Sequence, residues 1–317
     1  MRRTISFLGI VVLVLALAPP APASSGTMTI TSDTTLTEDH DGNIVIDADN
    51  VTLDCAGYSV TGNGEGIGIS IDGHSGVTVT NCLVTAHDDG IVIRGDASSN
   101  TLEANSTDSN ACFGVLVRNA DDNTVIDSQA NDNGCVGFVI VSSRGNHLID
   151  NLAQGNLANG FDVNYSSQTT LRGNRAIAND FMGIDLLRSD GNVLAGNTAR
   201  GNGSQGFQIQ RSSDNVLRDN ESLRNYEGFG ISRRSENNVL RSNTANHNLV
   251  AGISAWRSGN GLWDKNRAMA NGKFGFLLSA NFYTVTRNVA CRNGKWDALD
   301  TGYDNVWRAN DFCTSDI

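Results

Sequence analysis

The sequence predicts an all-β protein, a single-stranded right-handed parallel β-helix (solenoid) of about twelve turns with a 23-residue repeat. Three observations support this prediction. Asparagine recurs every 23 residues over most of the chain, apolar and polar residues alternate between the asparagines, and no proline follows residue 22. Proline removes a backbone donor from a sheet, so its absence suits a chain in which neighbouring strands use nearly every N–H group.

The N-terminal segment, residues 1–23, has the features of a secretory signal peptide. Two arginines precede an apolar run that ends in PPAPAS, which predicts cleavage after Ala23. No other stretch approaches the roughly 20 apolar residues that a transmembrane helix needs. We therefore expect a secreted or periplasmic chain without membrane insertion, in which residues 24–317 form one β-helix domain.

The chain is acidic, with a formal charge of −11 that becomes −13 when the two arginines of the signal are removed. A protein of this charge repels nucleic acid and anionic lipid except through local basic patches. We therefore expect no nucleic-acid partner.

The repeat is defined by columns of residues that lie 23 positions apart. The columns begin at Asn100, Asn105 and Asn110 (asparagine), Gly114 (glycine), Leu102 (apolar) and Thr107 (small). Between these markers, alternation such as GFQIQ (206–210) is typical of strands. Each repeat thus predicts three short strands separated by asparagine or glycine corners.

The asparagine and glycine columns also predict how the corners are made. We expect the asparagines to adopt the left-handed backbone of a corner and to hydrogen-bond to the turns above and below. We expect the glycine column to turn corners as well. Turns stacked about 4.8 Å apart would then give a rod on the order of 55–60 Å long.

These repeats resemble the right-handed β-helix repeat proteins of the NosD-like group (carbohydrate-binding and sugar-hydrolase, or CASH, proteins) in the pectin-lyase-like superfamily. N-x-L-x-x-N and N-x-x-x-G-[FI]-x-[VIL] units over residues 100–293 carry the resemblance, as does ITSDTTLTEDHDGNIVIDADNVTLDCAG at 30–57. The resemblance implies a periplasmic accessory role in copper delivery. Copper needs gathered His, Met or Cys ligands. The histidines at 40, 74, 87, 147 and 247 occupy different repeat offsets, so we predict no metal site from them.

Six cysteines in an exported chain predict disulfides, because stacked neighbours about 5 Å apart suit the Cα separation of a bridge. Two cysteines share one column 23 residues apart, two follow corner asparagines by three residues, and two end the similar phrases VTLDC and VTVTNC. The convergent spacings of a zinc site are absent. The predicted bridges are Cys112–Cys135, Cys291–Cys313 and Cys55–Cys82.

The strand after each glycine carries the candidate functional side chains. Two of its outward positions are Asp162 and Asp185, which we expect to stack on successive turns. Two carboxylates this close would raise one pKa or hold a cation between them. Just beyond the end of this strand lie Tyr165, Arg188, Arg211, Arg233, Trp256 and Arg257.

Three functions remain open for this face. The first is binding of a polysaccharide or cell-surface glycan, with arginines on its carboxylates or sulfates and with Tyr165 and Trp256 stacked on sugar rings. The second is a lyase or epimerase on uronic-acid polymers. Its base would be Asp162 or Asp185, and Arg188 or Arg211 would stabilise the developing charge. The third is a NosD-like accessory protein without catalysis. Ordinary solvated Asp–Arg pairs are the interpretation without a ligand.

The phrase HDDG at 87–90 is similar to the paired aspartates of polygalacturonases. The Gly-His-Gly and Arg-x-Lys phrases of those enzymes are missing, as is the Asp-Pro-His phrase of alginate epimerases. His87, Asp88 and Asp89 are therefore a secondary catalytic candidate. Grouped Asp88, Asp89, Asp121 and Asp122 leave a Ca²⁺ site open, and no other cofactor is expected.

Overall fold

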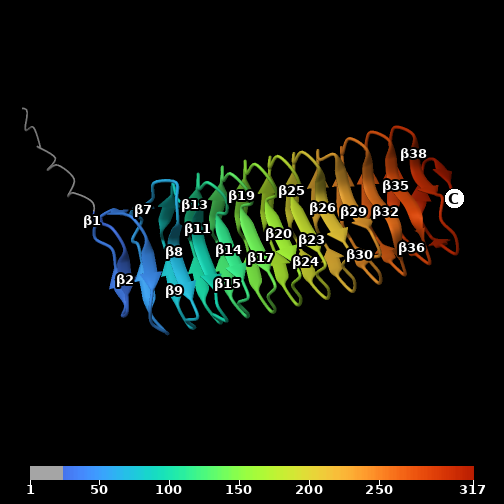
Figure 1. Ribbon diagram of the computed structural model, residues 1–317. Helices are drawn as coiled ribbons and strands as arrows, with labels where there is room; N and C mark the ends of the chain where they lie inside the picture. The colour runs from blue at the N-terminus through green and yellow to red at the C-terminus, as the bar shows by residue number, and fades with distance from the viewer. Residues whose placement is uncertain (1–23) are drawn as a thin grey trace, which may run out of the picture.

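The computed structural model describes residues 24–317, which form a rod of stacked parallel strands running from β1 at one end to the C-terminus at the other (Figure 1). The strands belong to three sheets, of 14, 14 and 13 strands. The predicted signal peptide lies outside the described residues.

The three sheets alternate along the chain, so that each coil contributes one strand to each sheet. Sheet A contains β1 (Ser24–Ser25), β4 (His40–Asp41), β7 (Ser59–Thr61), β10 (Leu83–Thr85), β13 (Ser106–Asp108), β16 (Gln129–Asn131), β19 (Leu152–Gln154), β22 (Arg175–Ile177), β25 (Thr198–Arg200), β28 (Glu221–Leu223), β31 (Thr244–Asn246), β34 (Arg267–Met269), β37 (Val289–Cys291) and β40 (Asp311–Phe312). Sheet B contains β2 (Met28–Ile30), β5 (Ile44–Ile46), β8 (Ile67–Asp72), β11 (Asp89–Arg94), β14 (Val115–Arg118), β17 (Phe138–Val141), β20 (Phe161–Asn164), β23 (Ile184–Leu187), β26 (Gln205–Gln210), β29 (Glu227–Ser232), β32 (Ala251–Gly259), β35 (Phe274–Asn281), β38 (Trp296–Asp300) and β41 (Ser315–Asp316). Sheet C contains β3 (Thr34–Thr35), β6 (Thr52–Asp54), β9 (Thr78–Thr80), β12 (Thr101–Glu103), β15 (Thr124–Ile126), β18 (His147–Ile149), β21 (Thr170–Arg172), β24 (Val193–Ala195), β27 (Val216–Arg218), β30 (Val239–Arg241), β33 (Leu262–Asp264), β36 (Thr284–Thr286) and β39 (Val306–Arg308).

Every strand pairs in parallel with the equivalent strand of the next coil. Leu171 of β21, for example, pairs with Leu194 of β24, one 23-residue repeat later. The predicted parallel β-helix of about twelve turns is therefore confirmed, and two-residue strands at both ends extend the stack. No α-helix occurs among residues 24–317, so none of them forms a helical membrane span.

Inward-facing side chains of the three sheets fill the interior of the rod. Leu171 and Leu194 are completely buried, and the rings of Phe138 and Phe161 stack with their centroids 4.9 Å apart on successive coils. Offset or parallel ring contacts at this distance add to the free energy gained by burying the aromatic surface. The interior is therefore one continuous core along the length of the rod.

The asparagine columns form hydrogen-bonded ladders, as predicted, but they do not occupy the left-handed corners. Asn174 is buried and donates from its backbone N–H and from Nδ2 to Oδ1 of Asn197, at 2.9 and 3.0 Å. The left-handed φ belongs to the residue just before each ladder asparagine, such as Asp150 (φ 55°) or Ala178 (φ 52°). The sequence interpretation of the corner was wrong because the ladder asparagine instead supplies acceptors to backbone donors that the corner leaves unpaired.

The glycine column has a different role from the predicted one as well. None of its members has a positive φ. A Cβ atom at Gly160 would lie 2.8 Å from the carbonyl oxygen of Gly183 and 2.9 Å from the Cβ of Ala176. Glycine is therefore required at this position by the close approach of the next coil, and the small-residue column provides the other half of that contact.

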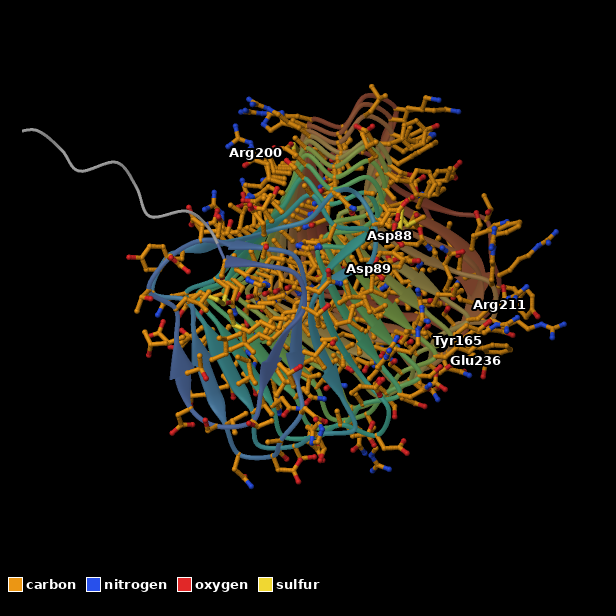
Figure 2. The ribbon with its side chains drawn as sticks, turned by 60° about the vertical axis from the view of Figure 1, so that its left-hand side comes forward. Asp88, Asp89, Tyr165, Arg200, Arg211 and Glu236 are labelled. Atoms are coloured by element: carbon orange, nitrogen blue, oxygen red, sulfur yellow. A yellow bond between two sulfur atoms is a disulfide. The ribbon has the colours of Figure 1, made fainter. Side chains whose placement is uncertain are left out.

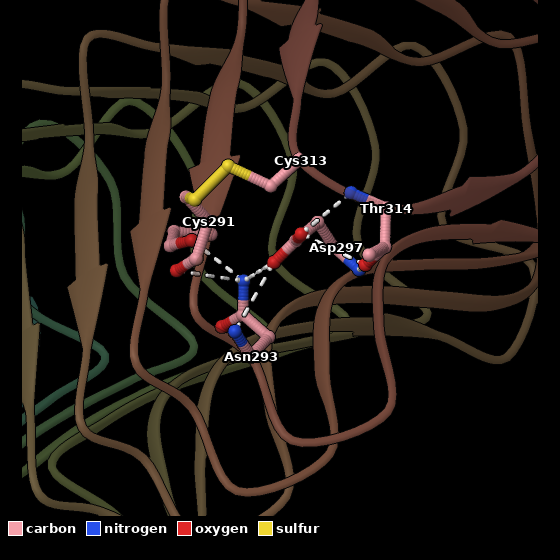
Figure 3. Close-up of a disulfide and its surroundings, with 6 residues drawn as sticks. Cys291, Asn293, Asp297, Cys313 and Thr314 are labelled. Atoms are coloured by element: carbon pink, nitrogen blue, oxygen red, sulfur yellow. Dashed lines mark hydrogen bonds between the residues drawn. A yellow bond between two sulfur atoms is a disulfide. The ribbon is translucent and has the colours of Figure 1, made fainter.

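Three disulfides join neighbouring coils at the predicted pairs, Cys55–Cys82, Cys112–Cys135 and Cys291–Cys313. Their Cα atoms are 4.4–5.1 Å apart, the separation that stacking imposes. Near the last bridge, Asp297 accepts hydrogen bonds from Asn293 and Thr314 and so ends an asparagine ladder (Figure 3). The disulfides indicate a location outside the reducing cytoplasm.

Candidate functional site

The outward column of sheet B changes chemistry along the rod. From the third coil onward it consists of Ser70, Val92, Leu116, Val139, Asp162, Asp185, Gln208, Gly230, Ser254, Leu277, Leu299 and Asp316. Val92, Leu116 and Val139 belong to a second, small apolar cluster outside the main core. Between Asp162 and Ser254 the same positions are polar or glycine, which defines the candidate site.

Asp162 and Asp185 are register partners on β20 and β23, as predicted. Asp185 is 7% exposed, and its carboxylate accepts only a long hydrogen bond, 3.5 Å, from Nε2 of Gln210. Burial raises the pKa of Asp162 to about 6. Burial and the charge of Asp162 raise the pKa of Asp185 to about 7. A pair of this kind can exchange a proton near neutral pH.

The arginines follow sheet B at a corner that repeats with every coil. Tyr165, Arg188 and Arg211 each have φ 52°, and the next residue in each case is a buried serine. These serines form a ladder that the sequence analysis missed, in which the backbone N–H of Ser189 donates to Oγ of Ser212 at 2.9 Å. The corner thus holds the stems of successive tyrosine and arginine side chains one strand spacing apart.

Five corner arginines, Arg188, Arg211, Arg233, Arg234 and Arg257, have no acidic partner among residues 24–317, and two of them pack on aromatic rings. Arg188 donates to the Tyr165 hydroxyl at 2.6 Å, and the guanidinium of Arg257 lies 4.2 Å from the ring centroid of Trp256. No ion pair formed by residues 24–317 involves any of the five corner arginines. The predicted surface ion pair between an aspartate of this face and Arg188 is therefore wrong. A surface depression, here named the arginine groove, is lined by Arg188, Arg211, Arg233, Arg234, Trp256 and Arg257.

Figure 2 shows Tyr165 and Arg211 with Glu236 at one edge of the rod, away from Asp88, Asp89 and Arg200. The structure therefore brings the predicted Tyr165, Arg188, Arg211, Arg233, Trp256 and Arg257 together along this edge, beside the Asp162–Asp185 pair. Arg233 is close enough to lower the pKa of Asp185 slightly against the effect of burial.

A second depression adjoins the arginine groove at Arg233 and Trp256, and the sequence analysis did not identify it. This polar pocket, of about 530 Å³, contains Glu227, Gln205 and Ser254 around the bare backbone of Gly230. Burial raises the pKa of Glu227. The 23-residue period is broken in this coil. Gly230 lies 22 residues after its register partner Gln208 and 24 residues before its other partner Ser254, so the coil has one residue fewer before the sheet B strand and one more after it. That shift places Glu227 in the pocket and adds Arg234 to the corner.

The HDDG residues occupy structural positions. His87 is fully buried, its backbone N–H donates to Oδ1 of Asn110, and burial lowers the pKa of its ring. It therefore stands in an asparagine ladder. Asp89 begins a sheet B strand, where burial raises its pKa and its carboxylate accepts from the N–H of Phe113.

The side chains of the four aspartates predicted as a possible calcium site do not lie close together. Asp88 and Asp89 lie where β11 begins, whereas Asp121 and Asp122 follow the end of β14, at the opposite end of the same sheet. Because the strands of sheet B are parallel, they all begin along one side of the rod and end along the other, so these two pairs of aspartates are separated by the length of a strand. Among residues 24–317, the predicted Ca²⁺ ligands are thus not gathered at one point.

The fold and site define a parallel β-helix protein with a polar groove on one outer face. The profile of the NosD family, described as periplasmic copper-binding protein (NosD), matches residues 23–161 and 114–238. The chain therefore belongs to the NosD family. No curated protein sequence matches it.

Solved structures share the fold at low identity. The A-module of mannuronan C-5 epimerase AlgE6 from Azotobacter vinelandii superposes with a TM-score of 0.70 at 15% identity, covering 92% of this chain and 91% of its own. A mutant of the periplasmic alginate epimerase AlgG gives 0.66 at 16%, covering 85% and 76%. The catalytic domain of a GH87 α-1,3-glucanase mutant with tetrasaccharides gives 0.63 at 16%, covering 83% and 60%.

The family description raises the question of a copper site. Within the described chain, the one group of three or more His, Cys, Asp or Glu side chains that converge is Cys291, Asp297 and Cys313, and its two sulfurs form a disulfide. A disulfide sulfur is not a thiolate ligand. His40 and His87 are buried, with ring nitrogens on Ser24 and on the carbonyl of Val60. These residues do not fit a copper centre.

Proposed function

We propose that this protein binds an acidic polysaccharide along the outer face of sheet B, from Tyr165 to Arg257, outside the cytoplasm. One observation carries the proposal: five arginines that have no acidic partner within residues 24–317 line a single groove on a chain whose formal charge is −11. Arginine binds carboxylates and sulfates through paired N–H donors, and the donors of these five side chains are not occupied by neighbouring carboxylates.

The spacing of the groove suits a linear polyanion. Successive corner residues are one strand apart, about 4.8 Å, which is close to the length of one sugar residue in an extended chain. Tyr165 and Trp256 are each about half exposed and offer ring surface at the two ends of the arginine groove. Structures with the same fold are named as enzymes that act on mannuronan, alginate or α-1,3-glucan, which supports a saccharide ligand.

Binding to polygalacturonate tests the proposal. Wild-type protein should bind this polymer more tightly than neutral dextran, and added salt should weaken the complex because exposed charges are screened. The double variant Arg188→Ala, Arg211→Ala should lose about tenfold or more in affinity. Arg200→Ala, which changes an exposed arginine away from this edge of the rod (Figure 2), should not. Equal binding by the two variants would contradict the proposal.

Catalysis on the same polymer is the second candidate function, because Asp162 and Asp185 have raised pKa values and lie on β20 and β23, the strands that end just before Tyr165 and Arg188. A carboxylate there would take the proton from C5 of a uronate, whose negative charge Arg188 or Arg211 would stabilise. Return of the proton to the other face gives the epimer, and loss of the 4-linked oxygen gives an unsaturated product. The purely binding role is compatible with a NosD-like accessory protein that lacks catalysis.

Ultraviolet absorbance of unsaturated uronate and NMR of the sugar protons measure these two reactions. The enzyme proposal predicts product with wild type and loss of turnover in Asp185→Asn with polymer binding retained. If the wild-type protein binds the polymer but forms no product, the catalytic proposal is wrong and only the binding function is supported.

A further inference from the structure

We infer that the polar pocket around Glu227 is a subsite for an uncharged, hydroxyl-bearing sugar residue. Because this pocket adjoins the arginine groove, the ligand class would be a heteropolysaccharide in which neutral residues stand beside acidic ones. The inference rests on the proposed polysaccharide binding and specifies its ligand.

The pocket exists because Gly230 has no side chain. Gly230 takes the outward position that Gln208 and Ser254 fill on the adjacent coils. A Cβ there would lie 2.6 Å from Oε1 of Gln208, so any side chain at this position would displace the amide. The resulting hollow, about 530 Å³, is within the size range of small-ligand sites.

Glu227 keeps unused hydrogen-bonding capacity. Its Oε2 is contacted by Nε2 of Gln205 at 3.5 Å and by Oγ of Ser254 at 3.4 Å, both at the limit of a hydrogen bond. A carboxylate can accept about four hydrogen bonds, and a half-buried carboxylate is costly to leave unsatisfied. Paired hydroxyl groups of a sugar would donate to these free positions.

The charge of Glu227 argues against an acidic sugar in the same place. Arg233 is the one cationic side chain that lines this pocket, and the wall apart from it and Glu227 is uncharged. This uncharged wall combines amide and hydroxyl groups with apolar side chains, namely Phe181, Met182, Ile231, Ala255, Trp256 and Leu277. A uronate carboxylate beside Glu227 would create a second close pair of like charges in a partly buried site. Amides and hydroxyls both donate and accept, which matches a neutral sugar ring.

Trp256 connects the two sites, since it lines the polar pocket and the arginine groove. The side chain is 47% exposed, and Arg257 packs over its ring. Aromatic rings of this kind provide an apolar surface for the C–H face of a sugar while their surroundings remain wet. A chain passing over Trp256 would therefore place consecutive residues in a neutral and a cationic environment.

Two polymers separate the possibilities: deacylated gellan, which has neutral sugars between uronates, and polygalacturonate, which has uronates alone. Wild-type protein should bind gellan more tightly per uronate. Glu227→Ala should weaken gellan binding about tenfold and leave polygalacturonate binding within about twofold. Ser254→Leu, which fills the pocket with the residue type found at position 277 of the next coil, should have the same selective effect.

Arg188→Ala, Arg211→Ala is the matched control and should weaken binding of both polymers. Circular dichroism should show unchanged folding of each variant. If Glu227→Ala and Ser254→Leu affect both polymers equally or neither, the neutral-sugar subsite is wrong and the arginine groove still stands. If wild type binds neither polymer, the proposed function fails and the subsite fails with it.

Discussion

The two halves of the rod share one backbone and differ in what they present to solvent. Residues 24–157 contain 3 arginines and 19 aspartates and glutamates, whereas residues 158–317 contain 18 lysines and arginines and 15 acidic residues. The corner after sheet B reflects the same division. It carries Asp96, Asn119 and Ser142 in the first half, and tyrosine followed by arginines in the second.

The comparison separates residues that build the coil from residues that give it a function. Inward columns are alike in both halves, as in the leucines and valines of sheet C from Val79 to Leu240. The outward column of sheet B changes from Leu116 and Val139 to Asp162 and Asp185 within two coils. Because stacking constrains only the inward and ladder positions, the outward ones are free to specify a ligand.

The largest expected effect comes from reversing the charge of the second half. In Arg188→Glu, Arg211→Glu, the carboxylates would repel a polyanion at the centre of the arginine groove. Affinity for polygalacturonate in a solution titration should fall by about a hundredfold or more.

The matched control reverses an arginine of the first half, Arg94, which is half-exposed and lies three strands of sheet B before the coil of Tyr165. Arg94→Glu should change the affinity less than about twofold. A similar loss in both proteins would mean that net charge alone, and no particular face, governs binding.

The next effect concerns the stability cost of the acidic pair. The pKa of Asp185 is raised from 3.8 to about 7, so the folded state holds its proton over a pH range in which the unfolded chain has lost it. Stability from this group is therefore fully present below pH 3.8 and is lost as pH rises through 7. Asp185→Asn should stabilise the fold by on the order of 2–4 kcal/mol at pH 8 and little near pH 4.

Urea unfolding of both proteins between pH 4 and 8 measures this difference. A gain in the free energy of unfolding that does not vary with pH would mean that the carboxylate is not the cause. Leu116→Asn, on the same outward column of the apolar half, is the control and should destabilise at every pH.

The smallest expected effect is the repair of a ladder. Thr169 interrupts the first asparagine column, and its buried Oγ1 has no hydrogen-bond partner in the described part of the chain. In Thr169→Asn, Oδ1 would accept from Asn146 as Asn146 itself accepts from Asn123. The free energy of unfolding should rise by about 1 kcal/mol.

Thr169→Val is the companion variant, because it removes the orphan hydroxyl without adding a ladder acceptor. Denaturant-induced unfolding should give a larger free energy of unfolding for Thr169→Asn than for Thr169→Val. The reverse order would show that the site has no room for the amide.

The fold and the disulfides could be predicted from sequence because stacking makes equivalent positions of successive coils into neighbours, and these positions are 23 residues apart in most of the chain. Cys112 and Cys135 lie in adjacent coils for that reason alone. The identity of the residue before each ladder asparagine could not be predicted, because this left-handed position accepts Ala178, Asp150 or Lys265 alike and so has no repeating residue type. The residue type that does repeat, asparagine, occupies the ladder position immediately after the left-handed residue.

The residues of the candidate site could be predicted only in coils that keep the 23-residue period. Asp162, Asp185, Arg188 and Arg211 follow the 23-residue spacing, and the structure brings them together. Glu227 and Arg234 were missed because that coil shifts by one residue, and Gly228, displaced in the glycine column, was the available signal. Burial, which sets the pKa values of the acids, depends on packing that a repeat alignment does not contain.

Chemical modification of arginine, read by mass spectrometry, tests the division between the halves most directly. Phenylglyoxal reacts with accessible guanidinium groups, and bound polygalacturonate should shield those that it contacts. We predict protection of Arg188, Arg211, Arg233, Arg234 and Arg257, with Arg94 and Arg118 reacting as they do without polymer. Equal protection of Arg94 and Arg118, or none at the five groove arginines, would contradict the account.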